Sequence, residues 1–246
     1  METRIFQTPL GEIWLQGQAE AFDGERPLIV GITGATAEPE ALDRLGDGLP
    51  QAAALVGHLP GNHCPPLLSA SVGAYAAAYS AALAQLGRPT IICGASVGGL
   101  VGMGVRAPNL RGLVALDPPL RTLGLWRTLP RFQAFVRTRA TAEERAFFWN
   151  VFGVAVDRIE DRDYRPLLDG LSTPTWCIVG GVPLMPERPL EQDPSLVGEA
   201  ERALLRAHPA IRVAVAEGVG HNIPGHAPGL VVAALRHLLE TQVSAP

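Results

Sequence analysis

Residues 91–100 read IICGASVGGL, in which apolar, β-forming residues run directly into a serine enclosed by glycines. Gly94 and Gly98 stand two residues before and two residues after Ser96, which is the G-x-S-x-G spacing of a sharp strand-to-helix turn. Such a turn strains the backbone of the serine, and neighbouring segments pass so close that the flanking positions must be small. It also directs the N-terminus of the next helix toward the serine, where that end favours negative charge. The stretch therefore predicts a nucleophilic serine at the edge of a sheet.

Strand and helix patterns alternate on both sides of this turn, after an opening hairpin of two strands (residues 3–8 and 12–17). Alternation of this kind predicts an α/β fold with an open, mostly parallel sheet covered by helices on both faces. The expected buried strands are residues 26–36, 52–61, 89–94, 110–117, 174–181 and 211–218. The expected helices are residues 37–45, 71–87, 97–106, 193–207 and 229–242. Gly87 is expected to end the second of these helices as its C-terminal glycine.

The alternation stops between about residues 121 and 173, where aromatic residues and arginines are more frequent. Within this stretch a helix is expected over residues 141–153, because Thr141 and Glu144 have capping-box spacing. We interpret the chain as one domain, residues 1–246, with a small, mainly helical cap inserted at 121–173.

Composition excludes several classes of protein. All 20 basic residues are arginine, which removes mechanisms that need a lysine amine, and the net charge of −4 gives no electrostatic signal for nucleic acid. Three widely spaced cysteines argue against a disulfide framework, and the first residues lack the pattern of a signal peptide. No metal site is expected, since His58, His63 and Cys64 do not have ligand spacing. We therefore expect a cytoplasmic protein that binds neither nucleic acid nor membrane, and the oligomeric state stays open.

A serine nucleophile needs a base, and the segment AEGVGHNIPGHAP contains two histidines. His221 follows an expected strand and a Gly-containing loop, from which its side chain can reach back over the sheet edge. His226 lies farther along, next to the last helix, and is the second choice.

With these motifs the chain resembles the α/β-hydrolase family, in the chain order Ser96, acid, His221. LIVGITGAT resembles the strand and oxyanion loop of that family, LVGHLPGNHCPP its DLPGHGRS-like segment, and GVGHNIPGHAP its histidine loop. The resemblance implies that the backbone N–H groups of Ala35 and Val97 form the oxyanion hole. Thr33 stands where the family often has histidine.

The acid of the triad departs from the common pattern of this family. Many members carry it a few residues after the strand that precedes the histidine segment, but Pro183 occupies that place here. Asp117, at the end of the strand after the serine helix, is the preferred candidate, since some lipases and dehalogenases of the family place their acid there. Glu187 and Asp193 stay open as alternatives, and Asp193 in DPS is also a typical helix-capping residue.

The resulting expectation is a serine hydrolase that cleaves a small-molecule carboxylic ester through an acyl-enzyme, without a cofactor. Thioesterase, C–C hydrolase and acyltransferase activities would use the same triad, and a non-catalytic binding protein on this fold is the alternative of a different class. Two cap residues are candidate substrate contacts: Trp126 for an apolar group, and Arg121 for an anionic one.

Overall fold

The structure is a computed structural model, and it describes residues 1–62, 64–125, 128–185 and 193–243. The described residues form one eight-stranded sheet in the order β1-β2-β4-β3-β5-β6-β7-β8, parallel from β4 to β8 and antiparallel at β1 and β2. The strands are β1 (Glu2–Thr8), β2 (Gly11–Gly17), β3 (Leu28–Ile32), β4 (Ala53–Gly57), β5 (Thr90–Ala95), β6 (Leu110–Leu116), β7 (Thr175–Gly180) and β8 (Ile211–Ala216). The α/β fold expected from the sequence is confirmed.

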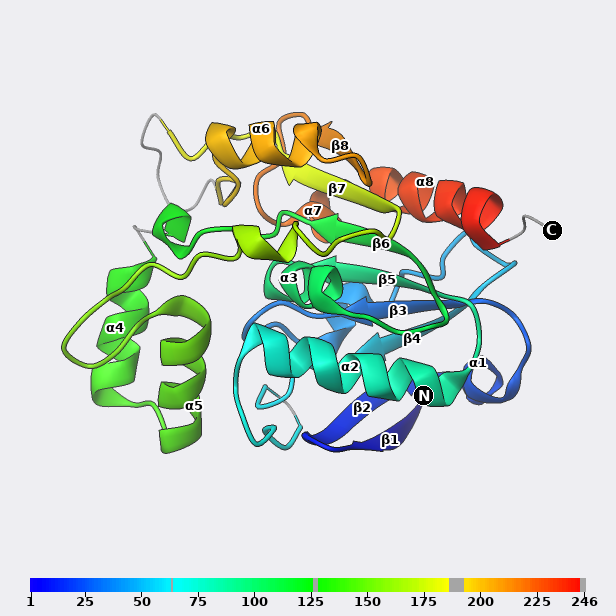
Figure 1. The fold of residues 1–246 in the computed structure, drawn as a ribbon, viewed down its shortest axis with the longest axis horizontal. Coiled ribbons are helices and arrows are strands. Elements are labelled where there is room, and N and C mark those ends of the chain that lie inside the picture. Colours follow the sequence, from blue (N-terminus) through cyan, green and yellow to red (C-terminus); the bar gives the residue numbers. More distant parts are fainter. Residues whose placement is uncertain (63, 126–127, 186–192, 244–246) are drawn as a thin grey trace.

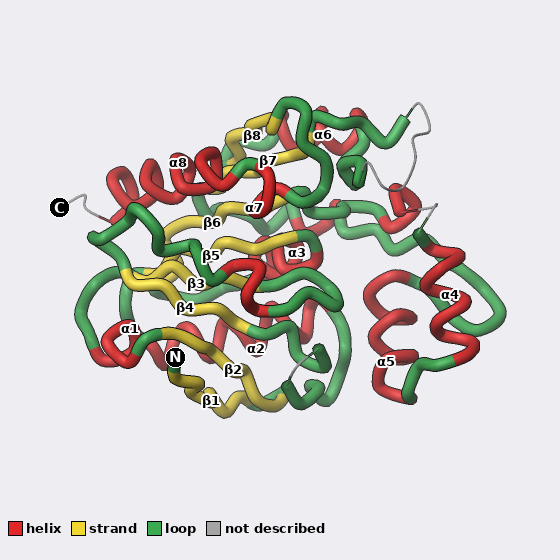
Figure 2. Tube along the Cα trace, turned by 180° about the vertical axis from the view of Figure 1, so that it is seen from behind, coloured by secondary structure: helices red, strands yellow, loops and turns green. Residues whose placement is uncertain are grey.

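Helices cover both faces of this sheet (Figures 1 and 2). The α-helices are α1 (Ala19–Asp23), α2 (Val72–Leu86), α3 (Val97–Gly104), α4 (Leu129–Thr138), α5 (Ala142–Phe147), α6 (Glu199–Ala207), α7 (Ile223–His226) and α8 (Pro228–Leu238). Short 3₁₀ segments lie at Pro39–Leu42, Thr122–Leu125 and Arg165–Leu167, and π-helical turns lie at Phe148–Phe152 and Leu239–Val243.

The core is divided by the sheet into two layers of buried side chains. One layer joins the sheet to α2, α3 and α6, and it contains the fully buried Tyr75, Tyr79 and Leu205. The other joins the opposite face to α8 and the 3₁₀ turn at Pro39–Leu42, with Leu235 buried among strand residues. Because both faces are covered, the central strands are apolar along their whole length, as in β3, where every residue is buried.

Local sequence signals set several helix ends. The side chain of Ser71 accepts a hydrogen bond from the amide of Ala74 at the start of α2, and Gly87 ends that helix in the left-handed conformation at φ +69°. The capping box of Thr141 and Glu144 is present at α5, as expected. The helix expected over residues 141–153 is nevertheless α-helical only to Phe147, because a π-helical turn follows.

Two other helix predictions were wrong in extent. Residues 37–45 contain only the 3₁₀ turn Pro39–Leu42. The helix expected to start near Asp193 begins at Glu199, and Asp193 instead adopts a positive φ of 45°. Hydrogen bonds from residues 221 and 222 to Asp193 hold it in this conformation, so tertiary contacts override the local DPS pattern.

The segment between β6 and β7 carries α4 and α5 at one end of the sheet (Figure 1). Its own aromatic cluster holds α4 against the π-helical turn, with the rings of Phe132 and Phe148 5.0 Å apart and those of Phe132 and Phe152 5.1 Å apart. We call this inserted segment between β6 and β7 the cap.

Candidate active site

Ser96 lies between β5 and α3 with φ 53° and ψ −117°, a conformation that costs energy for any residue with a side chain. The flanking glycines explain how the chain accommodates it. A Cβ atom added at Gly94 would lie 2.2 Å from the carbonyl oxygen of Gly98, and one at Gly98 would lie 2.2 Å from that of Ile32. Only glycine fits at either position, so the strain at Ser96 is held by close backbone packing on both sides.

His221 and Asp117 come from distant parts of the chain and meet beside this turn. His221 lies in the loop after β8, and Asp117 directly follows β6. The His221 Nδ1 atom is 2.8 Å from Asp117 Oδ2. The Asp117 side chain is fully buried, whereas a quarter of the His221 side chain is exposed. The carboxylate is therefore placed to fix the ring of His221 with Nδ1 protonated, which leaves Nε2 to act as a base.

Asp117 is held by donors on both of its oxygens. Oδ1 accepts hydrogen bonds from the Ser195 hydroxyl at 2.6 Å and the Gly180 amide at 3.0 Å. Oδ2 accepts from the Leu196 amide at 2.7 Å in addition to its contact with His221. These contacts fix the position of the carboxylate relative to the ring of His221.

A buried arginine, Arg202, adds further hydrogen bonds to this network. Arg202 is 8% exposed and donates hydrogen bonds to the Ser195 hydroxyl at 3.1 Å and to the Gly180 carbonyl at 2.6 Å. The Ser195 hydroxyl thus accepts from Arg202 and donates to Asp117. Neither Ser195 nor Arg202 was predicted from the sequence; for Arg202, the one signal is an arginine on the apolar side of an amphipathic helix.

The pKa of His221 is raised above its ordinary 6.5. Burial lowers it, but the hydrogen bond with Asp117 and the negative charges of Asp117 and Asp193 outweigh burial. These carboxylates therefore favour the protonated ring, which is the form that a base takes after it has accepted a proton from a nucleophile.

The loop after β3, residues 33–36, passes directly over Ser96. A Cβ added at Gly34 would lie 3.3 Å from the Cβ of Ser96, so the backbone of this loop is in contact with the serine. Thr36 has a positive φ of 57°. Ala35 lies between these two residues, is partly buried and lines the same cavity as Ser96.

Asn62 holds this loop from both sides of Ala35. Its Oδ1 accepts from the Thr36 amide at 3.1 Å, and its Nδ2 donates to the Gly34 carbonyl at 3.3 Å. The peptide groups before and after Ala35 are therefore fixed by one side chain. This role of Asn62 was not predicted from the sequence.

A cavity of about 230 Å³ gives access to these groups. Ser96, His221 and Ala35 line it together with Thr33, Leu42 and Asn222. Among the described residues, the Ser96 hydroxyl makes no hydrogen bond to His221. Hydrogen bonds between a nucleophile and its base often form only when a substrate is bound. The observation that bears on catalysis is therefore that Ser96 and His221 line the same cavity.

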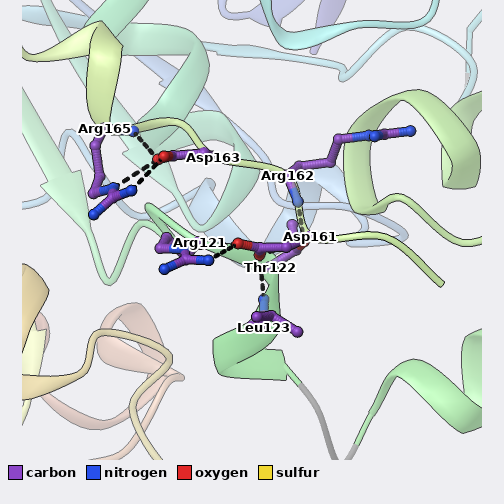
Figure 3. Close-up of polar contacts among 7 residues, drawn as sticks. All are labelled: Arg121, Thr122, Leu123, Asp161, Arg162, Asp163 and Arg165. Atoms are coloured by element: carbon purple, nitrogen blue, oxygen red, sulfur yellow. Dashed lines mark hydrogen bonds and ion pairs between the residues drawn. The ribbon is translucent and has the colours of Figure 1, made fainter.

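Arg121 does not line this cavity. Its Nε donates to Asp161 Oδ2 at 2.6 Å, and Asp161 also accepts from the Leu123 amide at 2.8 Å (Figure 3). An antiparallel bridge joins Arg121 to Asp163. The Arg121 guanidinium therefore links the start of the cap to Asp161, near its end. These contacts give no support to the prediction that Arg121 binds an anionic group of the substrate. Trp126 and Glu187 lie outside the described residues.

The remaining candidates take other positions. Asp193 accepts a hydrogen bond from the Asn222 amide at its carboxylate, and its backbone carbonyl accepts from the His221 amide, so it positions the histidine loop without contacting the ring. His226 ends α7. In the part of the chain that the structure describes, no group of three or more His, Cys, Asp or Glu side chains is placed to hold a metal ion, and no helix is long and apolar enough to cross a bilayer.

Comparison with known proteins identifies the family. Residues 14–235 match the model of the alpha/beta hydrolase family, so the chain belongs to that family. A search of curated protein sequences found no significant match.

Solved structures share the fold at low sequence identity. A hydrolase from Oleispira antarctica is 15% identical with a TM-score of 0.70, covering 94% of each chain. A thermophilic esterase from Thermogutta terrifontis is 19% identical with a TM-score of 0.65, covering 98% of each chain. Carboxylesterase CesB from Bacillus subtilis is 14% identical with a TM-score of 0.65, covering 97% of this chain and 92% of that chain.

Proposed function

We propose that this α/β hydrolase cleaves carboxylic esters of small molecules through an acyl-enzyme on Ser96. The observation that carries the proposal is one arrangement: Ser96 and His221 line the same cavity, and His221 Nδ1 is 2.8 Å from the buried Asp117 carboxylate. A strained serine, a histidine and a buried carboxylate in this relation are the parts of a nucleophilic triad. The esterases among the structures of the same fold are consistent with this choice.

In the proposed reaction, Ser96 Oγ attacks the ester carbonyl carbon while His221 Nε2 takes its proton. Asp117 holds the ring and stabilises the imidazolium that forms. The amides of Ala35 and Val97 donate to the negative oxygen of the tetrahedral intermediate. His221 then protonates the departing alcohol, which leaves the acyl group on Ser96. Water, deprotonated by His221, attacks this acyl-enzyme and releases the acid.

Val97 is suited to this role by its place in the chain. It is the first residue of α3, so its amide belongs to the helix end that has no partner within the helix and carries partial positive charge. Ala35 faces the same cavity from the opposite loop. An oxyanion above Ser96 would thus meet donors from two separate elements.

The test is covalent labelling of the intact protein with a fluorophosphonate probe, combined with hydrolysis of p-nitrophenyl esters. We expect one label at Ser96, and its loss together with esterase activity in Ser96→Ala. Ser172→Ala, which changes an exposed serine away from the cavity, is the matched control and should keep both. Absence of labelling in the folded wild-type protein, together with untouched esters, would make the chain a non-catalytic member of the family. Paired oxygen and thiol esters of the same acid distinguish an esterase from a thioesterase.

A further inference from the structure

The active-site cavity is lined mainly by apolar residues. These are Ala35, Ala37, Leu42, Ala95 and Pro224. Among the described residues that line the cavity, His221 is the one titratable side chain, and none comes from the cap. A charged substrate group beside the apolar residues would lose its hydration without gaining a partner, whereas an apolar group gains by leaving water.

The size of the cavity limits what can bind beside Ser96. At about 30 Å³ per non-hydrogen atom, the scale of a molecule in liquid water, its volume of about 230 Å³ holds roughly eight such atoms. In the proposed reaction the alcohol leaves and water enters, so both need the exposed side of the cavity, where Asn222 lies. The acyl group stays on Ser96 through both steps. It is therefore placed toward the buried side, where Leu42 lies with 2% exposure.

A smaller cavity lies behind Leu42. Its volume is about 50 Å³, and Leu45 and Val231 of α8 are among the residues that line it. Leu42 and Pro224 line both this cavity and the active-site cavity, so they separate the two spaces. Arg44 is the one charged residue among the described residues of the smaller cavity, and its side chain is 90% exposed. The space behind Leu42 is therefore suited to a hydrocarbon chain.

The sheet sets the position of Leu42. This residue ends the 3₁₀ turn Pro39–Leu42, and a Cβ added at Gly31 of β3 would lie 3.2 Å from its Cδ1 atom. The Cδ1 atom of Leu45 would lie 2.7 Å from the same added Cβ, so both leucines pack directly on the backbone of Gly31. Because a strand lies against it, the Leu42 side chain cannot move in that direction to admit a longer substrate.

We propose that Leu42 limits the length of the acyl chain, so that the preferred esters carry a short apolar acyl group of about two to four carbons. This inference rests on the proposed function of Ser96. Leu42→Ala removes three carbons, which at the same scale frees about 90 Å³ and joins the active-site cavity to the smaller one. The enlarged space holds the four additional carbons of an octanoyl group.

The catalytic test compares p-nitrophenyl butanoate with p-nitrophenyl octanoate, which share a leaving group. We expect kcat/KM of the wild-type enzyme to favour the butanoate by at least about tenfold, and Leu42→Ala to reduce this preference by about tenfold. Leu42→Val, which removes a single carbon, should change the preference in the same direction and serves if Leu42→Ala does not fold.

Leu45→Ala is the matched control. Leu45 packs on the same Gly31 and lines the smaller cavity, but it does not line the active-site cavity. The variant should therefore lower the urea midpoint about as much as Leu42→Ala does and keep the wild-type preference for the butanoate. If Leu45→Ala shifts the preference as far as Leu42→Ala does, loosening of the core explains the shift and the role of Leu42 is refuted.

A binding measurement separates this proposal from the esterase proposal. Calorimetry with Ser96→Ala should show tighter binding of methyl butanoate than of methyl octanoate, and Leu42→Ala in the same background should remove the difference. If the wild-type enzyme hydrolyses both p-nitrophenyl esters equally and folded Leu42 variants change nothing, the length limit is refuted while the esterase stands. If no ester is hydrolysed but binding depends on Leu42 in this way, the short-chain site stands without the esterase. If no ester is hydrolysed and both methyl esters bind alike, both proposals are refuted.

Discussion

Replacing Asp117 with asparagine tests the triad most directly, because the change keeps the shape of the side chain and removes one hydrogen-bond acceptor. In the native protein both oxygens accept from two donors each: Oδ1 from Ser195 and Gly180, and Oδ2 from Leu196 and His221. The asparagine NH₂ group can accept none of these hydrogen bonds. Since the Asp117 side chain is fully buried, water cannot replace the lost hydrogen-bond partners.

Both orientations of the new amide are unfavourable. If the NH₂ group takes the place of Oδ2, it faces the Leu196 N–H, which is also a donor. His221 must then accept a hydrogen bond at Nδ1, so the ring carries its proton on Nε2 and cannot act as a base. With NH₂ in place of Oδ1, it opposes the Gly180 N–H. Either way at least one buried donor loses its acceptor, so we expect Asp117→Asn to lower the free energy of unfolding by about 1–3 kcal/mol. Incorrect protonation of the histidine costs about 10⁴ in kcat in a serine protease triad, and we expect a loss of about 10²–10⁴ here.

The assay measures kcat and KM with p-nitrophenyl acetate at a pH above the pKa of His221, and urea unfolding of the same samples. Asp193→Asn is the matched control: this residue is an alternative acid, but its hydrogen bonds with the described residues of the histidine loop go to backbone amides. We expect it to keep most of its activity. Folded Asp117→Asn with more than about a tenth of the wild-type kcat/KM would refute the reasoning, because the ring of His221 would not need this carboxylate.

Three further predictions concern the surroundings of the serine. As the pH falls, kcat/KM should fall because the base, His221, becomes protonated. Since the pKa of His221 is raised, this loss of activity should begin above pH 6.5. Asp193→Asn removes one of the negative charges that raise this pKa, so it should shift the pH–rate profile to lower pH. If Asp193→Asn leaves the pH–rate profile unchanged, the charge of Asp193 does not contribute to the pKa of His221. Asn62→Ala should reduce kcat by about 10–100-fold through loosening of the oxyanion loop, with little change in KM under steady-state kinetics; a rise in KM alone would contradict a role in the transition state. Gly98→Ala should destabilise the protein by at least about 2 kcal/mol in urea unfolding, because its Cβ would lie 2.2 Å from a backbone oxygen, whereas Gly73→Ala, with nothing within 4 Å, should be tolerated. A stable Gly98→Ala protein would show that the turn relaxes.

The sequence was most informative where the structure depends on local sterics. The turn at Ser96 needs glycine at two fixed offsets, so its spacing can be recognised in a single chain, and the positive φ of Ser96 agrees with that prediction. The parallel sheet follows from alternation of strand and helix patterns over the whole length. Fold class was therefore predictable in full.

Contacts between distant segments could not be found in this way. Asp117 was one of several carboxylates that could reach the histidine loop, and the choice between them depends on where β6 and β8 end in space. Asn62 and Ser195 act through hydrogen bonds to Thr36 and Asp117, which are distant in the chain, and Arg202 acts through its hydrogen bond to Ser195. No periodicity or spacing marks such partners. For the same reason the prediction that Arg121 contacts the substrate does not take account of Asp161, forty residues later, which accepts a hydrogen bond from its guanidinium.

The paired ends of the cap have a consequence for how the protein unfolds and diversifies. An antiparallel bridge joins Arg121 to Asp163, and the Tyr164 amide donates a hydrogen bond to the Leu120 carbonyl. These contacts hold the start of the inserted segment beside residues 163 and 164, near the point where the chain returns to the main domain. The intervening residues are thus a closed loop anchored at its base. Since closing a loop costs little more when the loop is lengthened, this base can carry caps of different size with nearly the same stability of the sheet. The same anchoring allows the residues between these two points to unfold locally while β6 and β7 stay paired in the sheet.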